Sequence, residues 1–315
     1  MKMKIICAIW SLGFLLAISA YECRAALDGC DNFNDNSKDT NRWGTTIPAG
    51  VGLLTETNQR LEYSTGGAAT GSDRDGQPWI LNTGSYTNNW EVQVDFNLPS
   101  LNLTNGQSVS FTLLVYPDAN LANRFEFHLN QYSVNSWQFE MDVQVNNTNA
   151  TDITTNTLSS SAAGRIAFDA TTKTLSATYD EDGANCGYSW KLLGAAAVPP
   201  AWNLTSNSVF NAVIGAGSRN TVLASSNNLF LDNFKAASGS FPPFQIQRSG
   251  AGVAISWPTN APNFHLESTA TLSPPVCWDV VTNMTAVVGT NLTVTNSISS
   301  QTKFFRLSRT YSCEQ

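Results

Sequence analysis

The segment "FEMDVQV" holds the residues whose types and spacing are best suited to chemistry. Glu140, Asp142 and Gln144 alternate with apolar residues, so a β-strand would project all three from one face. Two carboxyl groups on one face can supply the nucleophile and the acid that hydrolyse a glycosidic bond. The same groups can hydrogen-bond sugar hydroxyls without any reaction. Because the amide of Gln144 cannot deliver a proton, the segment leaves catalysis and binding both open.

The preceding segment "RFEFHLN" has the same alternation and predicts the partner strand of a hairpin. We expect Glu126 to lie opposite Glu140 and Arg124 opposite Asp142, with His128 on the same face. Opposed Cβ atoms are about 4.5–5.5 Å apart, so two such carboxylates would repel and one could hold a proton. A slip of two residues would keep the faces and break these pairs. A solvated face with an Arg124–Asp142 salt bridge is the simpler interpretation.

No other segment provides a better nucleophile. The chain has no GxSxG motif, and its other histidine is His265, near the C-terminus. These features disfavour a hydrolase triad and a zinc protease site.

Aromatic side chains outside clear apolar runs are candidate platforms for sugar rings, because CH groups stack on aromatic faces. The candidates are Trp79, Tyr86, Tyr116 and Tyr132. Each could instead anchor a loop. Trp43, Trp90 and Trp137 belong to apolar runs and are predicted to lie in the core.

The first 25 residues have the pattern of a secretory signal peptide. Lys2 and Lys4 precede an apolar run at 5–20, and the small residue Ala25 suits cleavage. The run is too short for a typical membrane span. We therefore expect a secreted or cell-surface protein that is not inserted in a membrane.

The composition limits the partners. Charged residues are 13% of the chain, against about 25% in an average soluble domain. The net charge of −7 becomes −9 without the predicted signal peptide. Such a surface repels nucleic acid and anionic lipid, whereas a neutral polysaccharide is not repelled.

Four cysteines remain after the predicted cleavage, and their wide spacing excludes the usual zinc motifs. In an exported chain we expect two disulfides. One bond per domain, Cys30 with Cys186 and Cys277 with Cys313, is the favoured arrangement of three possible ones.

Period-two alternation, interrupted by Gly, Asn and Pro, continues through most of the chain and predicts an all-β protein. The segment "ASGSFPP" interrupts the pattern, because two prolines cannot continue a ladder. We therefore predict a large domain at 28–238, a linker at 239–243 and a small β-sandwich at 244–315, with Trp257 and Trp278 in the core of the latter.

The segments "DNFNDNSKDTNRWGT", "WEVQVDFNLP", "GRIAFDATTKTLSATYD" and "LFLDNFKA" together resemble the concanavalin A-like lectin and glucanase superfamily, particularly its laminin-G-like domains. The resemblance covers residues 28–238 and implies an antiparallel jelly-roll sandwich that binds ligands on its concave sheet. In the glucanases of this superfamily Glu140 would match the nucleophile and Asp142 its helper. Gln144 departs from the family pattern where the acid should stand. The C-terminal segment is similar to small immunoglobulin-like modules of secreted bacterial proteins.

The resemblance also brings two acidic segments together, since the first and last strands of such domains commonly pair. Asp31 and Asp35 of "DNFND" would then lie near Asp232 of "LDNF", and their oxygen atoms suit a structural calcium ion. Asp180 and Asp182 of "YDEDG" form a second oxygen-rich segment. Strand-end capping and a hairpin turn are the alternatives for these two segments.

The sequence thus favours an exported, non-catalytic carbohydrate-binding protein with a glycan as its partner. A glycoside hydrolase that uses Glu126, Glu140 and Asp142 is the second hypothesis, and a structural or adhesive surface protein is the third. The oligomeric state stays open. The predicted ligand-binding residues are Arg124, Glu126, His128, Glu140, Asp142, Gln144, Trp79, Tyr86 and Tyr132.

Overall fold

The computed structural model describes residues 29–311 apart from 68, 70, 119, 184, 274–275 and 298–301. The predicted signal peptide, residues 1–25, lies outside the described residues. Strands dominate, and two short 3₁₀ turns, η1 (Pro200–Trp202) and η2 (Ser225–Asn227), interrupt them. Within the described ranges, no helix has the length and apolar character that a bilayer span requires. The all-β prediction is confirmed.

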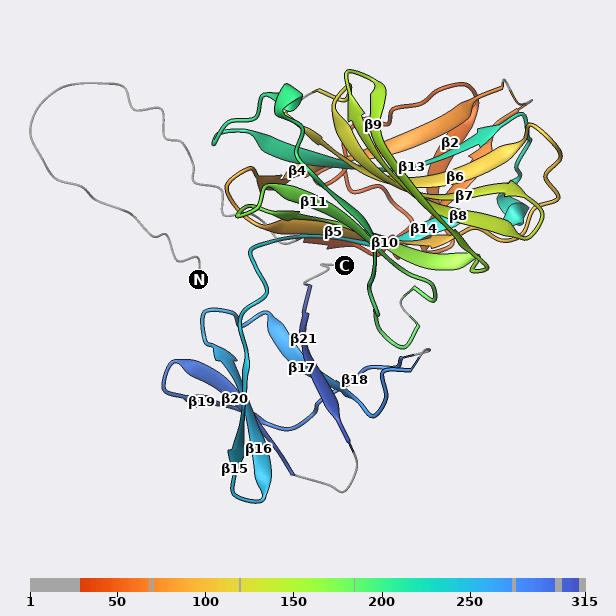
Figure 1. The fold of residues 1–315 in the computed structure, drawn as a ribbon. Helices are drawn as coiled ribbons and strands as arrows, with labels where there is room; N and C mark the ends of the chain where they lie inside the picture. The colour runs from red at the N-terminus through yellow and green to blue at the C-terminus, as the bar shows by residue number, and fades with distance from the viewer. Residues whose placement is uncertain are drawn as a thin grey trace, which may run out of the picture.

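The first sheet of the main sandwich has eight antiparallel strands in the order β12-β11-β10-β5-β14-β3-β2, with β1 beside β14 (Figure 1). Its strands are β1 (Gly29–Asp31), β2 (Gly52–Thr57), β3 (Arg60–Thr65), β5 (Trp90–Asn97), β10 (Ser161–Asp169), β11 (Thr174–Asp180), β12 (Lys191–Ala197) and β14 (Phe230–Ser238). The pairing of β1 with β14 confirms that the first and last strands of this region lie side by side.

The second sheet has six antiparallel strands in the order β4-β13-β6-β7-β8-β9. Its strands are β4 (Asp73–Ser85), β6 (Ser108–Pro117), β7 (Arg124–Ser133), β8 (Ser136–Val145), β9 (Thr148–Thr157) and β13 (Val209–Arg219). In β6 every second residue is buried, from Val109 to Val115, while Ser110 and Thr112 face outward. The alternation therefore assigns one face of this sheet to the core and the other to solvent.

The core between the two sheets contains a row of phenylalanine rings. Phe127 of the six-stranded sheet stacks on Phe96 of the other sheet at 5.9 Å between ring centroids. A Cβ atom added at Gly164 in β10 would lie 2.3 Å from the Phe127 ring. Only glycine fits beneath these rings, and each fully buried phenylalanine contributes about 1.5–3 kcal/mol of hydrophobic stabilisation.

The prediction that Trp79 is a sugar platform is wrong. Its side chain is 1% exposed and packs against Trp43 at 4.9 Å and Phe234 at 4.8 Å between ring centroids. Trp79 lies in β4, where the alternation turns it inward, so no ligand can reach its face. The core assignments of Trp43, Trp90 and Trp137 are confirmed.

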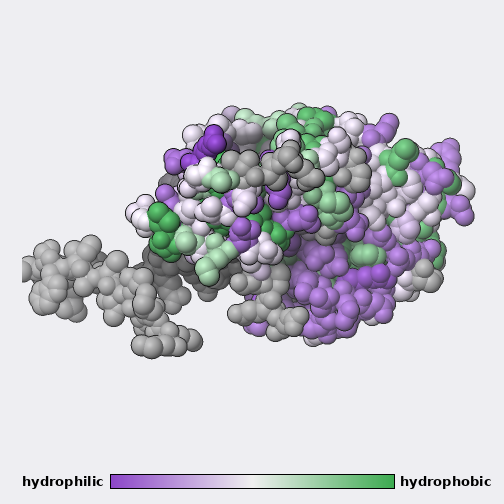
Figure 2. Space-filling model, turned by 90° about the horizontal axis from the view of Figure 1, so that it is seen from below, coloured by the Kyte–Doolittle hydropathy of each residue, from purple (hydrophilic) through white to green (hydrophobic). Residues whose placement is uncertain are grey.

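Seven further strands form what we call the C-terminal unit, with sheets β15-β16-β20-β19 and β18-β17-β21. The strands are β15 (Gln245–Ser249), β16 (Gly252–Pro258), β17 (Phe264–Thr269), β18 (Asp279–Val280), β19 (Thr285–Val288), β20 (Asn291–Ser297) and β21 (Phe304–Arg309). Ile255, Trp257 and Leu266 belong to a hydrophobic core separate from that of the main sandwich. Viewed from below, hydrophobic residues form separate patches beside a broad hydrophilic area (Figure 2).

The favoured disulfide pairing is wrong, because Cys186 pairs with Cys277 and links the main sandwich to the C-terminal unit. Cys30 is disulfide-bonded as well, and Cys313 lies outside the described residues. The expected one-bond-per-domain pattern fails because the loop after β11 reaches the C-terminal unit, so cysteines from different units meet.

Polar and cation–π contacts surround this disulfide. The Trp278 backbone N–H donates to the Cys186 carbonyl at 2.8 Å, and the Arg306 guanidinium stacks on the Trp278 ring at 4.2 Å. Arg306 also donates to the backbone carbonyl of Tyr188. Trp278 therefore lies at the contact between the two units and not in the small core as predicted.

Candidate functional site

The outward face of the six-stranded sheet, which we call the groove face, arranges its side chains in rows across the strands. One row contains, from β4 to β9, Gly76, Gly215, Thr112, His128, Glu140 and Thr154. The adjacent row contains Pro78, Val213, Leu114, Glu126, Asp142 and Asp152. Uncharged residues of β13 and β6 thus lie beside charged residues of β7 and β8.

The expected pairing of β7 with β8 is wrong by two residues. Glu126 lies opposite Asp142, while Glu140 lies opposite His128. Tyr132 belongs to β7, and the turn is shorter than expected, with Asn135 at a φ of 55°. This tight turn sets the register, and the faces are preserved because the shift is even. Arg124 therefore forms its ion pair with Glu126 and not with Asp142 as expected.

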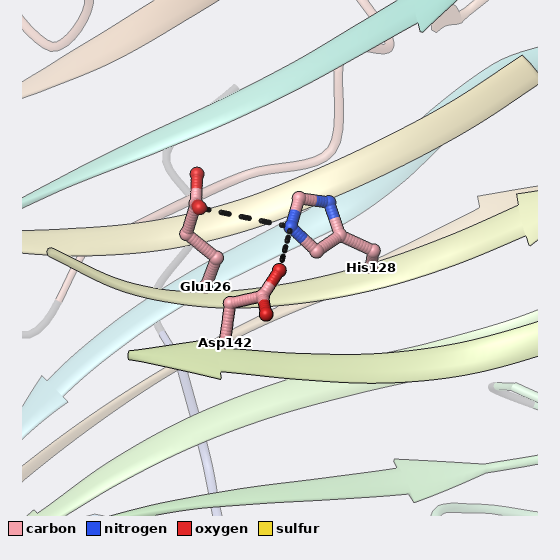
Figure 3. A group of neighbouring side chains, drawn as sticks. All are labelled: Glu126, His128 and Asp142. Atoms are coloured by element: carbon pink, nitrogen blue, oxygen red, sulfur yellow. Dashed lines mark ion pairs between the residues drawn. The ribbon is translucent and has the colours of Figure 1, made fainter. Parts of the chain in front are cut away.

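A histidine lies between two carboxylates at the centre of this face (Figure 3). Nε2 of His128 is 3.6 Å from Asp142 Oδ2 and 3.9 Å from Glu126 Oε2. On the other side of the ring, Nδ1 is 2.9 Å from the hydroxyl of Thr112. Arg124 pairs with Glu126 at 3.0 Å between Nε and Oε1. The ring is thus held by partners on three strands.

The charges of this cluster stabilise one another. Burial opposes the charged imidazolium, yet the adjacent carboxylates of Glu126, Glu140 and Asp142 raise the pKa of His128. Burial likewise opposes ionisation of Glu126, yet His128 and Arg124 lower its pKa. Burial, with repulsion from Glu140 and Glu126, raises the pKa of Asp142 to about 7. Near neutral pH the cluster therefore contains an ionised Glu126 and an Asp142 carboxyl group that can gain or lose a proton, beside an imidazole whose protonated form the carboxylates favour.

Glu140 is held by neighbours on β7. Its Oε2 accepts hydrogen bonds from the Asn130 side-chain amide and, at 3.3 Å, from the Tyr132 hydroxyl. Tyr132 is 50% exposed. Of the predicted aromatic platforms, Tyr132 is thus the one that contacts the carboxylate cluster.

Gln144 and Arg124 complete the end of this face. The Gln144 side chain is buried and donates to the side-chain oxygen of Asn149, whose amide donates to Asp142 at 3.3 Å. Arg124 donates to Asn147 Oδ1 at 2.9 Å. The structure therefore brings the polar residues predicted on β7 and β8 together on one face.

A groove of about 550 Å³ runs beside this cluster. Its floor includes Ser110 and Thr112 of β6 and Gly215 and Gly217 of β13. One wall comes from Arg124, Glu126 and His128, and the other from residues 47–49 and 72–76. Gly215 and Gly217 leave the floor open, because a side chain at either position would project into the groove.

Two other predicted aromatic platforms are not among the residues that line the groove. Tyr86 packs on Phe168 at 5.6 Å between ring centroids, and Lys173 covers its ring at 4.3 Å. Tyr116 is half-buried on β6, and burial raises its pKa. Tyr86 is therefore a loop anchor against the core and does not face the groove.

Two groups among the described residues have the geometry to share a metal ion. The ligand atoms of Glu126, His128 and Asp142 lie within 4.8 Å of one another, as do those of Glu140, Asp142 and Asp152. The second group offers only carboxylate oxygens, which suit calcium or magnesium, whereas the imidazole of the first group suits transition metals.

The predicted calcium ligands are not gathered in this way. Asp31 accepts from the Trp43 indole at 2.7 Å and from the Phe33 backbone at 2.8 Å, which corresponds to the capping alternative. Asp35 and Asp232 accept from nearby backbone N–H groups. Calcium at Asp31, Asp35 and Asp232 stays a prediction. Asp180 also accepts backbone N–H groups, from Asp182 and Ser189.

Sequence reasoning missed the other half of the site. Arg74, Ser110, Thr112 and the segment "GAGSR" of β13 line the groove. The signal was present in Gly215 and Gly217, whose alternation with apolar residues marks an outward face without side chains. Assigning that face to the same groove as Glu126 required the strand order.

Comparison with known proteins gives matches among solved structures. The carbohydrate recognition domain of Emp46p in its potassium-bound form matches with a TM-score of 0.45 and 9% identity, covering 67% of this chain and 96% of that one. An endo-1,3-beta-glucanase from Streptomyces sioyaensis matches with a TM-score of 0.44 and 13% identity, covering 67% of this chain and 95% of that one. The metal-free form of lectin I-B4 from Griffonia simplicifolia matches with a TM-score of 0.40 and 10% identity, covering 68% of this chain and 100% of that one. No family model and no curated protein matches.

Proposed function

We propose that this chain binds a polysaccharide in the groove of its six-stranded sheet. The observation that carries the proposal is the groove itself, about 550 Å³ in volume, with a floor of glycines and hydroxyl side chains. Binding sites for small molecules typically measure about 300–1,000 Å³ and place a few polar groups around the ligand. Ser110 and Thr112 supply hydroxyls on the floor, and Arg124 and Glu126 supply charged groups on the wall.

The function is binding without catalysis. A glycosidase needs an acid beside a free nucleophile, but Glu126 is engaged by both Arg124 and His128. Gln144 has no proton to give and is buried against Asn149. Each side chain of the cluster is therefore positioned as a fixed hydrogen-bonding group.

One observation favours a glycoside hydrolase as the second candidate. Carboxylate oxygens of Glu126 and Asp142 lie within 4.8 Å of one another, and retaining glycosidases keep their two carboxyl groups about 5–5.5 Å apart. The pKa of Glu126 is lowered while that of Asp142 is raised to about 7, and such a separation can assign one group as nucleophile and the other as acid. The pair would then be Glu126 with Asp142, in place of the predicted Glu126 with Glu140.

The remaining proposals concern the whole chain. Residues 1–25 act as a signal peptide and direct the protein out of the cell, where disulfides are stable. Residues 28–238 form the binding domain, residues 239–243 are a linker, and residues 244–315 form an immunoglobulin-like module that attaches or spaces it. A structural calcium ion at Asp31, Asp35 and Asp232 belongs to the same proposal.

Native gels that contain a polysaccharide test the binding proposal. We expect retardation of the mature protein by at least one polymer, without clearing of that polymer. Gly217→Leu should abolish retardation, because a Cβ there meets only ordinary contacts near 3.4 Å and the rest of the side chain fills the floor. Thr55→Leu, at an exposed position of β2, is the matched control and should bind normally.

Two outcomes would overturn the proposal. Clearing of the polymer, lost in Asp142→Asn, would establish the hydrolase. Unchanged mobility in every polymer would favour a structural or adhesive role. Repeating each gel with a chelator tests calcium, since only metal-dependent binding would then be lost.

A further inference from the structure

Two arginines, Arg74 and Arg219, line one end of the groove. Arg74 of β4 lies directly across from Gly217, and Arg219 follows two residues further along β13. Both side chains are exposed. Within the part of the chain that the structure describes, neither guanidinium takes part in an ion pair.

The acidic residues beside Arg74, Asp73 and Asp75, also line the groove, but their carboxylates accept hydrogen bonds from backbone N–H groups. The Asp73 carboxylate accepts from the Val51 backbone at 2.9 Å. The Asp75 carboxylate accepts from the Leu54 backbone at 2.9 Å. Both are buried, with 1% and 4% of their surface exposed. Both carboxylates are thus engaged by backbone groups, whereas the Arg74 side chain is exposed.

The charged side chains at the two ends of the groove are therefore engaged differently. At the β7 wall, Arg124 and His128 pair with Glu126 and Asp142, whereas the guanidinium groups of Arg74 and Arg219 are exposed at the other end and take part in no ion pair among the described residues. Arginine forms paired, charge-assisted hydrogen bonds with planar or tetrahedral oxyanions, and carboxylate and sulfate groups both fit that fork.

We propose that the polysaccharide of this groove is anionic, and that Arg74 and Arg219 bind its carboxylate or sulfate groups while Ser110 and Thr112 contact its hydroxyls. This inference rests on the proposed binding function and specifies the ligand class. The acidic surface elsewhere does not prevent contact, because charges more than about 8 Å away are largely screened at physiological salt.

The test compares three polymers in the same affinity gels and in titration calorimetry: a polyuronate, a sulfated galactan and a neutral β-glucan. Arg74→Gln/Arg219→Gln is compared with Arg248→Gln/Lys303→Gln, which removes the same charge from exposed sites of the C-terminal unit. We expect tighter binding of an anionic polymer by the wild type, weakened about tenfold or more in the groove variant and unchanged in the control. The preferred anionic polymer distinguishes carboxylate from sulfate.

The other outcomes overturn the inference in distinguishable ways. Equal binding of the neutral polymer by wild type and groove variant would refute the anionic ligand and leave the binding function standing. An equal loss of binding in both double variants would show that the anionic polymer is attracted to the protein non-specifically, and would refute the assignment to Arg74 and Arg219. Failure of all three polymers to bind the folded wild type would refute the binding function as well.

Discussion

The outer faces of the two sheets of the main sandwich have similar chemistry and different surroundings. On the groove face, Arg124, Glu126, His128 and Asp142 form a charged cluster beside an open groove. On the outer face of the eight-stranded sheet, Arg165 pairs with Glu91 at 3.4 Å, and Tyr311 donates to Glu91 at 3.1 Å.

The C-terminal unit makes the difference. Tyr311 follows β21, and Arg309 of β21 donates to the Ser238 carbonyl at 2.8 Å, so this unit covers part of the eight-stranded sheet (Figure 1). Glu91 on the covered face thus contacts the C-terminal unit, whereas Arg124, Glu126 and His128 border the groove. Polar alternation alone does not identify a binding face.

Removal of the Cys186–Cys277 disulfide should give the largest effect. The bond joins residues 91 apart in sequence, and loss of a disulfide closing a long loop typically costs about 2–5 kcal/mol. We expect Cys186→Ser/Cys277→Ser to lower the urea midpoint and to increase hydrogen exchange in β5 and β10. Exchange that rises equally in β7 and β8 would contradict the distinction between covered and open faces.

The buried Asp95 of β5 should make the protein less stable as the pH rises. Burial raises its pKa to about 7, although Asn233 and Tyr188 donate hydrogen bonds to it at 2.9 and 3.2 Å. In the unfolded chain the group ionises near 3.9. Between about pH 4 and 7 the folded state binds more protons, so stability falls as the pH increases.

Asp95→Asn should therefore reduce the difference in Tm between pH 5 and pH 8, measured by thermal unfolding. The exposed Asp279→Asn is the matched control and should keep the wild-type pH profile. A variant with an unchanged profile would show that Asp95 is not the titrating group.

On the groove face, Glu126 should control the protonation of His128. After the opposing effect of burial, Glu126 is the strongest influence on that ring, ahead of Glu140. We expect Glu126→Gln to lower the His128 pKa by more than Glu140→Gln does, as followed by NMR of the ring protons. A larger shift in Glu140→Gln would mean that Glu140, which lies opposite His128, and not Glu126 controls the protonation of the ring.

The smallest effect should come from a polar residue of the groove face outside the cluster. Gln138 is half-buried and lies across from Asn130. Gln138→Ala should change the free energy of unfolding by less than about 0.5 kcal/mol. Glu91→Ala on the covered face should cost about 1–3 kcal/mol, because it leaves Arg165 and Tyr311 without their carboxylate. If urea titrations gave the same loss of unfolding free energy for both variants, the proposed difference between the groove face and the covered face would be wrong.

The sequence predicted the site only in part. The polar face of β7 and β8, with Arg124, Glu126, His128, Glu140 and Asp142, follows directly from alternation. The pairing of Glu126 with Asp142 does not, because an even shift of register leaves the same residues on the same face. Trp79 was misassigned, because its position in a Gly- and Pro-containing segment obscured its inward phase within β4.

By itself, the sequence determined the strands, their inward and outward residues and the low-charge acidic surface, because each depends on residue type and on a spacing of two. The tertiary structure alone decided the register of β7 against β8, the meeting of Cys186 with Cys277, the gathering of Arg74 and Arg219 along the groove and the covering of one sheet face. These features depend on contacts between segments far apart in the chain, and no local pattern specifies which distant segments meet.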